Sequence, residues 1–143
     1  MEIRKSALVG RSAIETFDLI EAAEHYPLFL PWCADAQILE RSAKEVSARL
    51  TIDFHGIRFA LTTRNPKQRP RWMKVHLQQG PFRRFEGEWR LTELAADACR
   101  IDFDLRYEWG GGLTGFLARP IFNDIANTMV DAFARRAEQG VDR

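Results

Sequence analysis

One helical run in the last third of the chain restricts what the rest can form. Over residues 113–137, apolar residues recur at three- and four-residue spacing, which is the period of an amphipathic α-helix. Its other face carries polar residues such as Asp124, Thr128 and Arg135. An apolar face this broad needs a large partner surface, and a sheet provides one. Pro120 interrupts the run, so we expect a break or kink there.

The residues before this run predict the sheet. Apolar and polar residues alternate with period two, most clearly over residues 46–55, and this is the pattern of a half-buried strand. The predicted strands are 2–9, 36–41, 46–55, 57–64, 71–79, 84–91 and 99–108. Short turns join them, apart from a polar loop over 65–70. Such strands form an antiparallel sheet with one wet face, and the helix makes the fold α+β.

Two shorter features lie near the amino terminus. Ser12 and Glu15 have the spacing of a capping box and predict a helix that ends near residue 23. Residues 25–33, HYPLFLPWC, are strongly apolar for a connecting segment. Pro27 can begin a short helix there and Pro31 can end it. The segment is either a plug at one end of the core or the lip of an apolar cavity.

Composition limits the classes of function. A chain of 143 residues predicts one domain, over residues 1–143, and a net charge of +1 provides no global field for nucleic acid or anionic membrane. Cys33 and Cys99 are far apart in sequence and indicate reduced buried thiols. No apolar segment follows the first residues as in a signal peptide, so we expect a cytoplasmic protein.

Motifs for catalysis are missing from the sequence. His25, His55 and His76 have no metal-ligand spacing, so we expect no metal site. No nucleophile elbow or phosphate-binding glycine loop is present. The carboxylates on the predicted strands alternate with apolar residues, which is typical of cross-strand ion pairs. We therefore predict a protein that is not an enzyme and that requires no cofactor.

Two groups of residues are candidate binding sites. The first is aromatic and is either a close-packed core or the wall of a cavity for a lipid-like ligand: Phe29, Trp32, Phe54, Phe59, Trp89, Phe103, Phe122 and Phe133. The second is basic and is either a solvated edge or an RNA contact: Arg64, Lys67, Arg69 and Arg71 around one loop, with Arg83 and Arg84 in another.

Several motifs together resemble the coenzyme Q-binding START-like family, whose bacterial members include polyketide cyclase/dehydrase-like proteins and ribosome-association toxins. The motifs are YPLFLPWC over 26–33, TTRN over 62–65, GPF over 80–82, Gly87 and Trp89, and IANTMVDAFARRA over 125–137. The resemblance extends over nearly the whole chain. It implies a helix-grip fold, in which a curved antiparallel sheet of about six or seven strands wraps around a long C-terminal helix.

The resemblance also implies a function without a defined reaction. It implies that a hydrophobic small molecule, ubiquinone or another polyprenyl lipid, binds between sheet and helix, with transient contact at the inner membrane. It adds Tyr26, Pro31 and Met129 to the expected ligand-binding residues, and Tyr26, Asn123 or Arg64 would orient a head group. The alternative is a toxin that binds the large ribosomal subunit and blocks subunit joining. A third interpretation, a cyclase-type enzyme, rests on analogy with the fold only.

Overall fold

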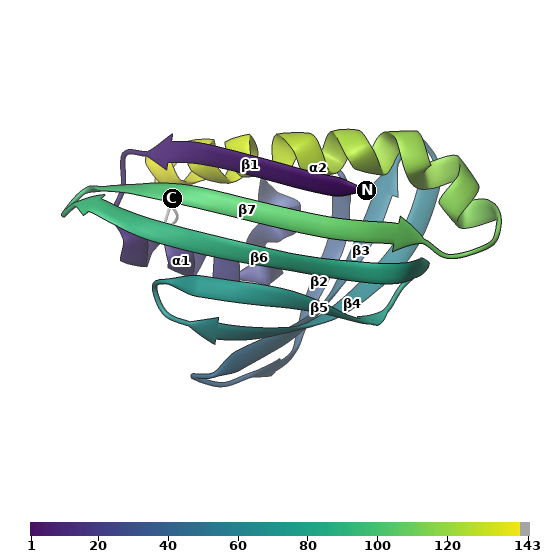
Figure 1. Ribbon diagram of the computed structural model, residues 1–143, viewed down its shortest axis with the longest axis horizontal. Helices are drawn as coiled ribbons and strands as arrows, with labels where there is room; N and C mark the ends of the chain where they lie inside the picture. Colours follow the sequence, from purple (N-terminus) through teal and green to yellow (C-terminus); the bar gives the residue numbers. More distant parts are fainter. Residues whose placement is uncertain (141–143) are drawn as a thin grey trace.

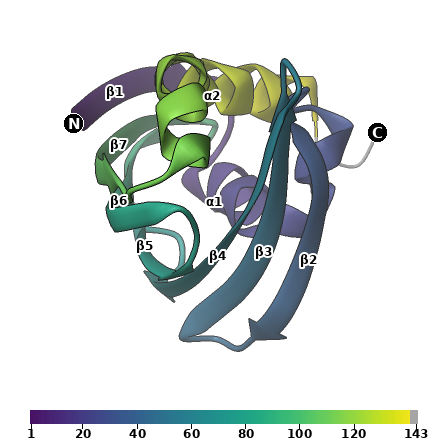
Figure 2. The same cartoon turned by 90° about the vertical axis from the view of Figure 1, so that its right-hand side faces the viewer.

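The computed structural model describes residues 1–140. They form a curved antiparallel sheet with a long helix along one face (Figures 1 and 2). The elements in chain order are β1 (Glu2–Val9), α1 (Ala13–Glu21), the 3₁₀-helix η1 (Ala23–Leu28), β2 (Cys33–Arg41), β3 (Glu45–Phe54), β4 (Ile57–Gln68), β5 (Trp72–Gln79), β6 (Phe82–Ala95), β7 (Ala98–Trp109) and α2 (Leu113–Gln139). The predicted α+β class and the helix-grip architecture are confirmed.

The sheet has seven strands in the order β1-β7-β6-β5-β4-β3-β2, and every neighbouring pair is antiparallel. Strands β2 to β7 form successive hairpins, while β1 pairs with β7. The two edge strands are therefore β1 and β2, and α1 and η1 connect them. Figure 2 shows how the sheet curves around α2, with β1 beside the helix on one side and the β3–β4 hairpin on the other.

The predicted alternation decides which side of the sheet is the core. In β7 every second residue is buried, as at Ile101, Phe103 and Leu105. The intervening positions hold charged residues that form ion pairs on the outer face, such as Asp104 with Arg90 at 2.9 Å. The sheet is thus dry on the side of α2 and wet on the other.

At the β3–β4 turn Gly56 has φ +80°, a left-handed conformation that glycine adopts without strain.

Helix α1 begins as its sequence predicts. The Ser12 hydroxyl accepts a hydrogen bond from the backbone N–H of Glu15 at 3.0 Å, which satisfies one free donor of the first turn. Phe17 and Ile20 of this helix are buried in the core, whereas Ile14 is half exposed.

Two local predictions are wrong. The short helix of the HYPLFLPWC segment was predicted to begin at Pro27. It begins at Ala23 instead, and Pro27 lies inside it. The predicted loop over 65–70 is largely strand, because β4 continues to Gln68. Asn-Pro-Lys composition is typical of turns, but Asn65 pairs with Val46 on β3 and Lys67 pairs with Met73 on β5. Pairing on both sides outweighs the local preference for a turn.

Helix α2 is continuous through Pro120, so the predicted break does not occur. Figure 1 shows the first turns of α2 inclined to the rest of the helix, which agrees with a bend near the proline. Beyond Pro120 the face turned to the sheet is buried at Phe122, Ala126, Val130 and Phe133. This part of α2 covers the concave side of the sheet.

Candidate functional site

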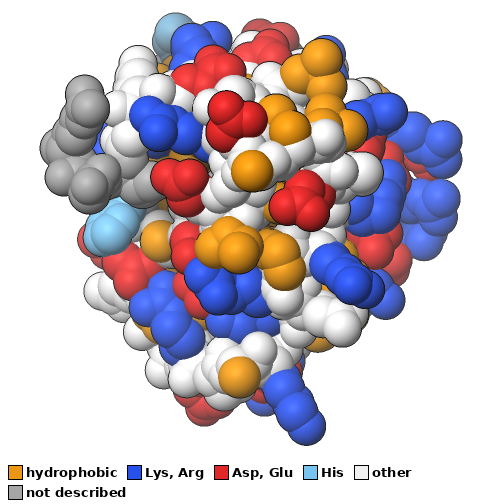
Figure 3. Space-filling view, turned by 90° about the vertical axis from the view of Figure 1, so that its left-hand side faces the viewer, with side chains coloured by type: hydrophobic (Ala, Val, Ile, Leu, Met, Phe, Trp, Pro, Cys, Tyr) orange, Lys and Arg blue, Asp and Glu red, His pale blue; other side chains and the backbone are white. Residues whose placement is uncertain are grey.

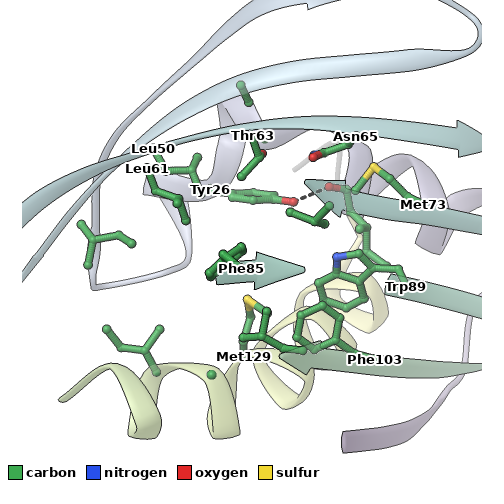
Figure 4. Close-up of a pocket in the computed structure, with 18 of the residues that line it drawn as sticks. Tyr26, Leu50, Leu61, Thr63, Asn65, Met73, Phe85, Trp89, Phe103 and Met129 are labelled. Carbon is green, nitrogen blue, oxygen red and sulfur yellow. Dashed lines mark hydrogen bonds between the residues drawn. The ribbon is translucent and has the colours of Figure 1, made fainter. Parts of the chain in front are cut away.

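A cavity of about 90 Å³ lies between the sheet and α2 (Figure 4). Its wall comes from α1, η1, strands β3 to β7 and the middle of α2, and most of the lining side chains are apolar. Alternate residues of a strand point to one face, so the inward positions of five adjacent strands converge here. The sequence left a packed core and a cavity as alternatives, and the structure contains a small cavity within a packed core.

Six of the residues predicted to bind a ligand line this cavity. They are Tyr26, Trp32, Trp89, Phe103, Phe122 and Met129. The rings of Trp89 and Phe103 pack 4.3 Å apart between centroids and form one wall. Met129 reaches in from α2 and is half buried. Its unbranched side chain can adapt to ligands of different shape.

Two further predicted residues, Phe54 and Phe59, line a smaller cavity of about 10 Å³ beside the first. This second cavity lies between the β3–β4 hairpin and the first half of α2. It shares Phe122 with the main cavity, so both spaces contact the same ring. The hairpin and this part of α2 therefore meet without filling the space between them.

Three residues of the predicted set lie outside the cavity. Phe133 is fully buried and packs edge-on against Trp89 at 5.2 Å between ring centroids, behind the cavity wall. Phe29 packs on Phe133 on one side, and the Arg136 guanidinium lies 5.3 Å from the Phe29 ring centroid on another. Pro31 is exposed. In the HYPLFLPWC segment, Tyr26 and Trp32 thus reach the cavity, whereas Phe29 and Pro31 do not.

One side of the cavity is polar. Thr63 and Asn65 from β4 lie at the cavity together with Tyr26 (Figure 4). Glu21 of α1 is a further lining residue. The Tyr26 hydroxyl donates to the backbone carbonyl of Ile20. Burial raises the pKa of Tyr26, so its hydroxyl is neutral at physiological pH. Asn65 is 92% buried, and its Oδ1 accepts no hydrogen bond from any described residue.

Apart from Tyr26, the sequence interpretation missed the residues of this polar side. Asn65 follows Leu61 and Thr63 at two-residue spacing, which would have placed it on the inner face of an extended β4. Placing the end of that strand at residue 64 concealed the signal. Of the three residues suggested to orient a head group, Tyr26 lines the cavity. Arg64 is exposed, and Asn123 accepts a hydrogen bond from the Tyr107 hydroxyl at 3.1 Å.

A network of ion pairs surrounds Glu21, and its Lys67 pair is largely buried. The Lys67 ammonium contacts the Glu21 carboxylate at 2.6 Å, and the Lys67 side chain is only 7% exposed. Arg41 contacts Glu21 at 2.8 Å and Glu24 at 2.8 Å. Lys67 was a candidate RNA contact, and its burial against Glu21 removes it from the surface.

The remaining candidate RNA contacts are mostly ion-paired. Arg69 contacts Asp18 at 2.7 Å, Arg64 contacts Glu45 at 3.1 Å, and Arg84 contacts Glu86 at 3.4 Å. Arg71 and Arg83 are exposed, and neither forms an ion pair with a residue that the structure describes. Figure 3 shows positive and negative side chains interspersed on one face of the molecule. The predicted basic cluster is thus largely a solvated, charge-paired edge.

Two features are absent from residues 1–140, a cluster of metal-ligating side chains and a helix that could span a membrane. No three potential metal-ligating His, Cys, Asp or Glu side chains come together there. His25, His55 and His76 are exposed. No helix in the same range is long and apolar enough to cross a membrane.

A seven-stranded sheet closed by one long helix over an apolar cavity defines the helix-grip, START-like class. Solved structures share this fold. A START superfamily protein from Mycobacterium smegmatis aligns with a TM-score of 0.80 at 22% identity, covering 96% of this chain and 97% of that one. An aromatase/cyclase from a Streptomyces species aligns with a TM-score of 0.78 at 22% identity, covering 99% and 95%.

Within this class the chain belongs to the family described as polyketide cyclase/dehydrase and lipid transport, whose model matches residues 9–134. The ribosome association toxin RatA of Pseudomonas aeruginosa is 39% identical over 137 residues, covering 96% of this chain and 95% of the relative. The mitochondrial coenzyme Q-binding protein COQ10 homolog B of Xenopus laevis is 23% identical over 141 residues, covering 96% of this chain and 58% of the relative.

Proposed function

We propose that this protein binds an uncharged polyprenyl lipid, of which ubiquinone is the leading candidate, and that it does so without catalysing a reaction. The observation that carries this proposal is the apolar cavity between the sheet and α2, with the uncharged polar side chains of Tyr26, Thr63 and Asn65 on one side. Such a cavity suits a molecule with a greasy tail and a compact polar head. The COQ10 relative, named for coenzyme Q binding, supports the same ligand class.

The size of the cavity sets a condition on binding. Its volume of about 90 Å³ is smaller than the engineered cavity of about 150 Å³ that holds benzene. A quinone ring with its tail therefore requires the cavity to enlarge. The smaller cavity between the β3–β4 hairpin and α2 indicates where the helix and sheet can separate. Met129 can also change rotamer to make room.

Burial of the tail supplies the affinity. Each 100 Å² of apolar ligand surface removed from water contributes about 2.5 kcal/mol. Part of this gain is used to separate α2 from the sheet. A ligand with several isoprene units is therefore expected to bind more tightly than a short-chain analogue.

The test begins with protein purified from a host that makes ubiquinone. Organic extraction and mass spectrometry should find quinone at a substantial fraction of the protein concentration. Stripped protein should then take up added decylubiquinone, followed through quenching of the fluorescence of Trp89 and Trp32 in the cavity wall. Absence of both co-purified lipid and uptake would refute the proposal.

A second candidate function is association with the large ribosomal subunit. The observation that favours it is the 39% identity over nearly the full length with a protein named as a ribosome association toxin. Binding to ribosomal RNA would depend on exposed cations, and Arg71 and Arg83 are the members of the predicted basic cluster that no described ion pair neutralises. Such binding weakens steeply as salt rises.

Ribosome sedimentation tests this second function. Added protein should reduce the fraction of joined subunits, and the double variant Arg71→Glu and Arg83→Glu should lose this effect. Lys74→Glu provides a matched charge reversal on neighbouring β5, where the ammonium lies over the Trp72 ring. Unchanged sedimentation profiles with wild-type protein at low salt would exclude ribosome association.

A further inference from the structure

The side-chain oxygen of Asn65 has no hydrogen-bond donor in the described part of the chain. It is 92% buried, lines the main cavity, and its Oδ1 accepts no hydrogen bond. A buried carbonyl oxygen without a donor is costly, and native proteins rarely keep one without a reason. A hydrogen-bond donor supplied by the ligand would satisfy it.

Glu21, the acidic residue among those that line the cavity, is already ion-paired. Its carboxylate contacts Lys67 at 2.6 Å and Arg41 at 2.8 Å. Tyr26 remains protonated, and its proton is committed to the Ile20 carbonyl. A charged head group would therefore lie here without a free counter-charge, which is unfavourable in a buried site. The polar side of the cavity suits a neutral head.

We infer that Asn65 selects a neutral lipid whose head group carries a hydroxyl donor, and hence the reduced hydroquinone form of a quinone over its oxidised form. This inference rests on the proposed lipid-binding function. Oxygen atoms of an oxidised quinone only accept hydrogen bonds, so they leave Asn65 Oδ1 unsatisfied. A hydroquinone O–H can donate to that oxygen, and the same hydroxyl can accept from the Thr63 hydroxyl on the same face of β4.

The test compares the two redox forms of one ligand. Decylubiquinol and decylubiquinone are titrated without oxygen into stripped protein, with tryptophan fluorescence as the readout. One hydrogen bond to an otherwise unsatisfied buried group predicts that the reduced form binds about tenfold more tightly. In Asn65→Leu this preference should fall to less than about twofold, mainly through weaker binding of the reduced form.

Two further variants keep the result interpretable. Thr62→Val removes a buried hydroxyl from the opposite face of β4, where Thr62 Oγ1 accepts from Arg49 at 3.4 Å, and it should keep the wild-type preference. Thr63→Val should reduce the preference in part and provides a second reading if Asn65→Leu does not fold. Circular dichroism establishes folding of each variant.

The outcomes separate this inference from the function on which it rests. If both redox forms bind wild-type protein equally, or the oxidised form binds more tightly, the inference is overturned while lipid binding stands. If Asn65→Leu folds and retains the full preference, Asn65 is not the selecting residue and the inference is overturned. If neither form binds, the proposed function fails and the inference fails with it.

Discussion

Filling the cavity should stabilise the protein and abolish ligand binding at the same time. Ala126 is 2% exposed and lines the cavity from the middle of α2. An unfilled cavity destabilises a protein by about 24 cal/mol for each Å³, so a cavity of about 90 Å³ corresponds to about 2 kcal/mol. Leucine at position 126 adds three carbon atoms that point into this space. Ala126→Leu should therefore raise the free energy of unfolding by about 1 to 2 kcal/mol.

Urea denaturation and the decylubiquinone titration together measure both effects of this substitution. The matched control is Ala137→Leu, because Ala137 is also 2% exposed on α2 but lies about three turns further along, outside the cavity wall. Extra carbon atoms in a filled region should destabilise by about 1 to 3 kcal/mol. The reasoning is refuted if Ala126→Leu is destabilised like the control, or if it binds ligand as well as the wild type.

Three further predictions concern the charged and titrating groups. Lys67→Met should lower the free energy of unfolding by about 2 kcal/mol in urea, because Glu21 keeps only Arg41 as a partner, and adding Glu21→Gln should restore much of the loss. The hydrogen bond from Arg41 lowers the pKa of Glu24 below 4.5, so this pair stabilises the fold above pH 4.5 and the contribution disappears as pH falls through the lowered pKa. The pair is partly exposed, so Glu24→Gln should remove less than about 1 kcal/mol of acid-dependent stability in denaturation curves between pH 2 and 6. Burial raises the pKa of Cys33 to about 11, and iodoacetamide at pH 8 should therefore label Cys33 only when urea unfolds the chain, with mass spectrometry as the readout.

Period-two alternation was enough to predict the sheet, because each strand has one dry and one wet face. In β7 every second residue from Cys99 to Tyr107 is buried. The predictions were wrong for segments in which the local composition favours one structure and pairing with neighbouring strands favours another. Asn65, Pro66 and Lys67 favour a turn by type, yet neighbouring strands pair with this segment on both sides. A single sequence does not contain the strength of that pairing.

The candidate site was predictable as a class of residues but not as a geometry. The apolar pattern identified large side chains of the core, and Trp89 and Phe103 do line the cavity. The same pattern also predicted Phe133 as a ligand-binding residue, but Phe133 packs behind the cavity wall. Both positions are apolar and buried, and only the curvature of the sheet over α2 decides which one borders empty space. Hydrophobic periodicity predicts which face of a helix or strand is buried, but it does not predict how the side chains pack against that face.

The basic residues near β4 and β5 acquire a different meaning once their partners are known. Lys67 and Arg41 neutralise the carboxylate of Glu21, a residue that lines the cavity. Part of the predicted RNA-binding cluster therefore balances the charge of a cavity residue. Charge reversal at Lys67 would disturb the cavity and the surface together, and a loss of ribosome association in that variant would be uninterpretable. Arg71 and Arg83 are exposed and belong to no described ion pair. Substitutions at these two positions, compared with Asn65→Leu inside the cavity, separate a role on the ribosome from a role in lipid binding.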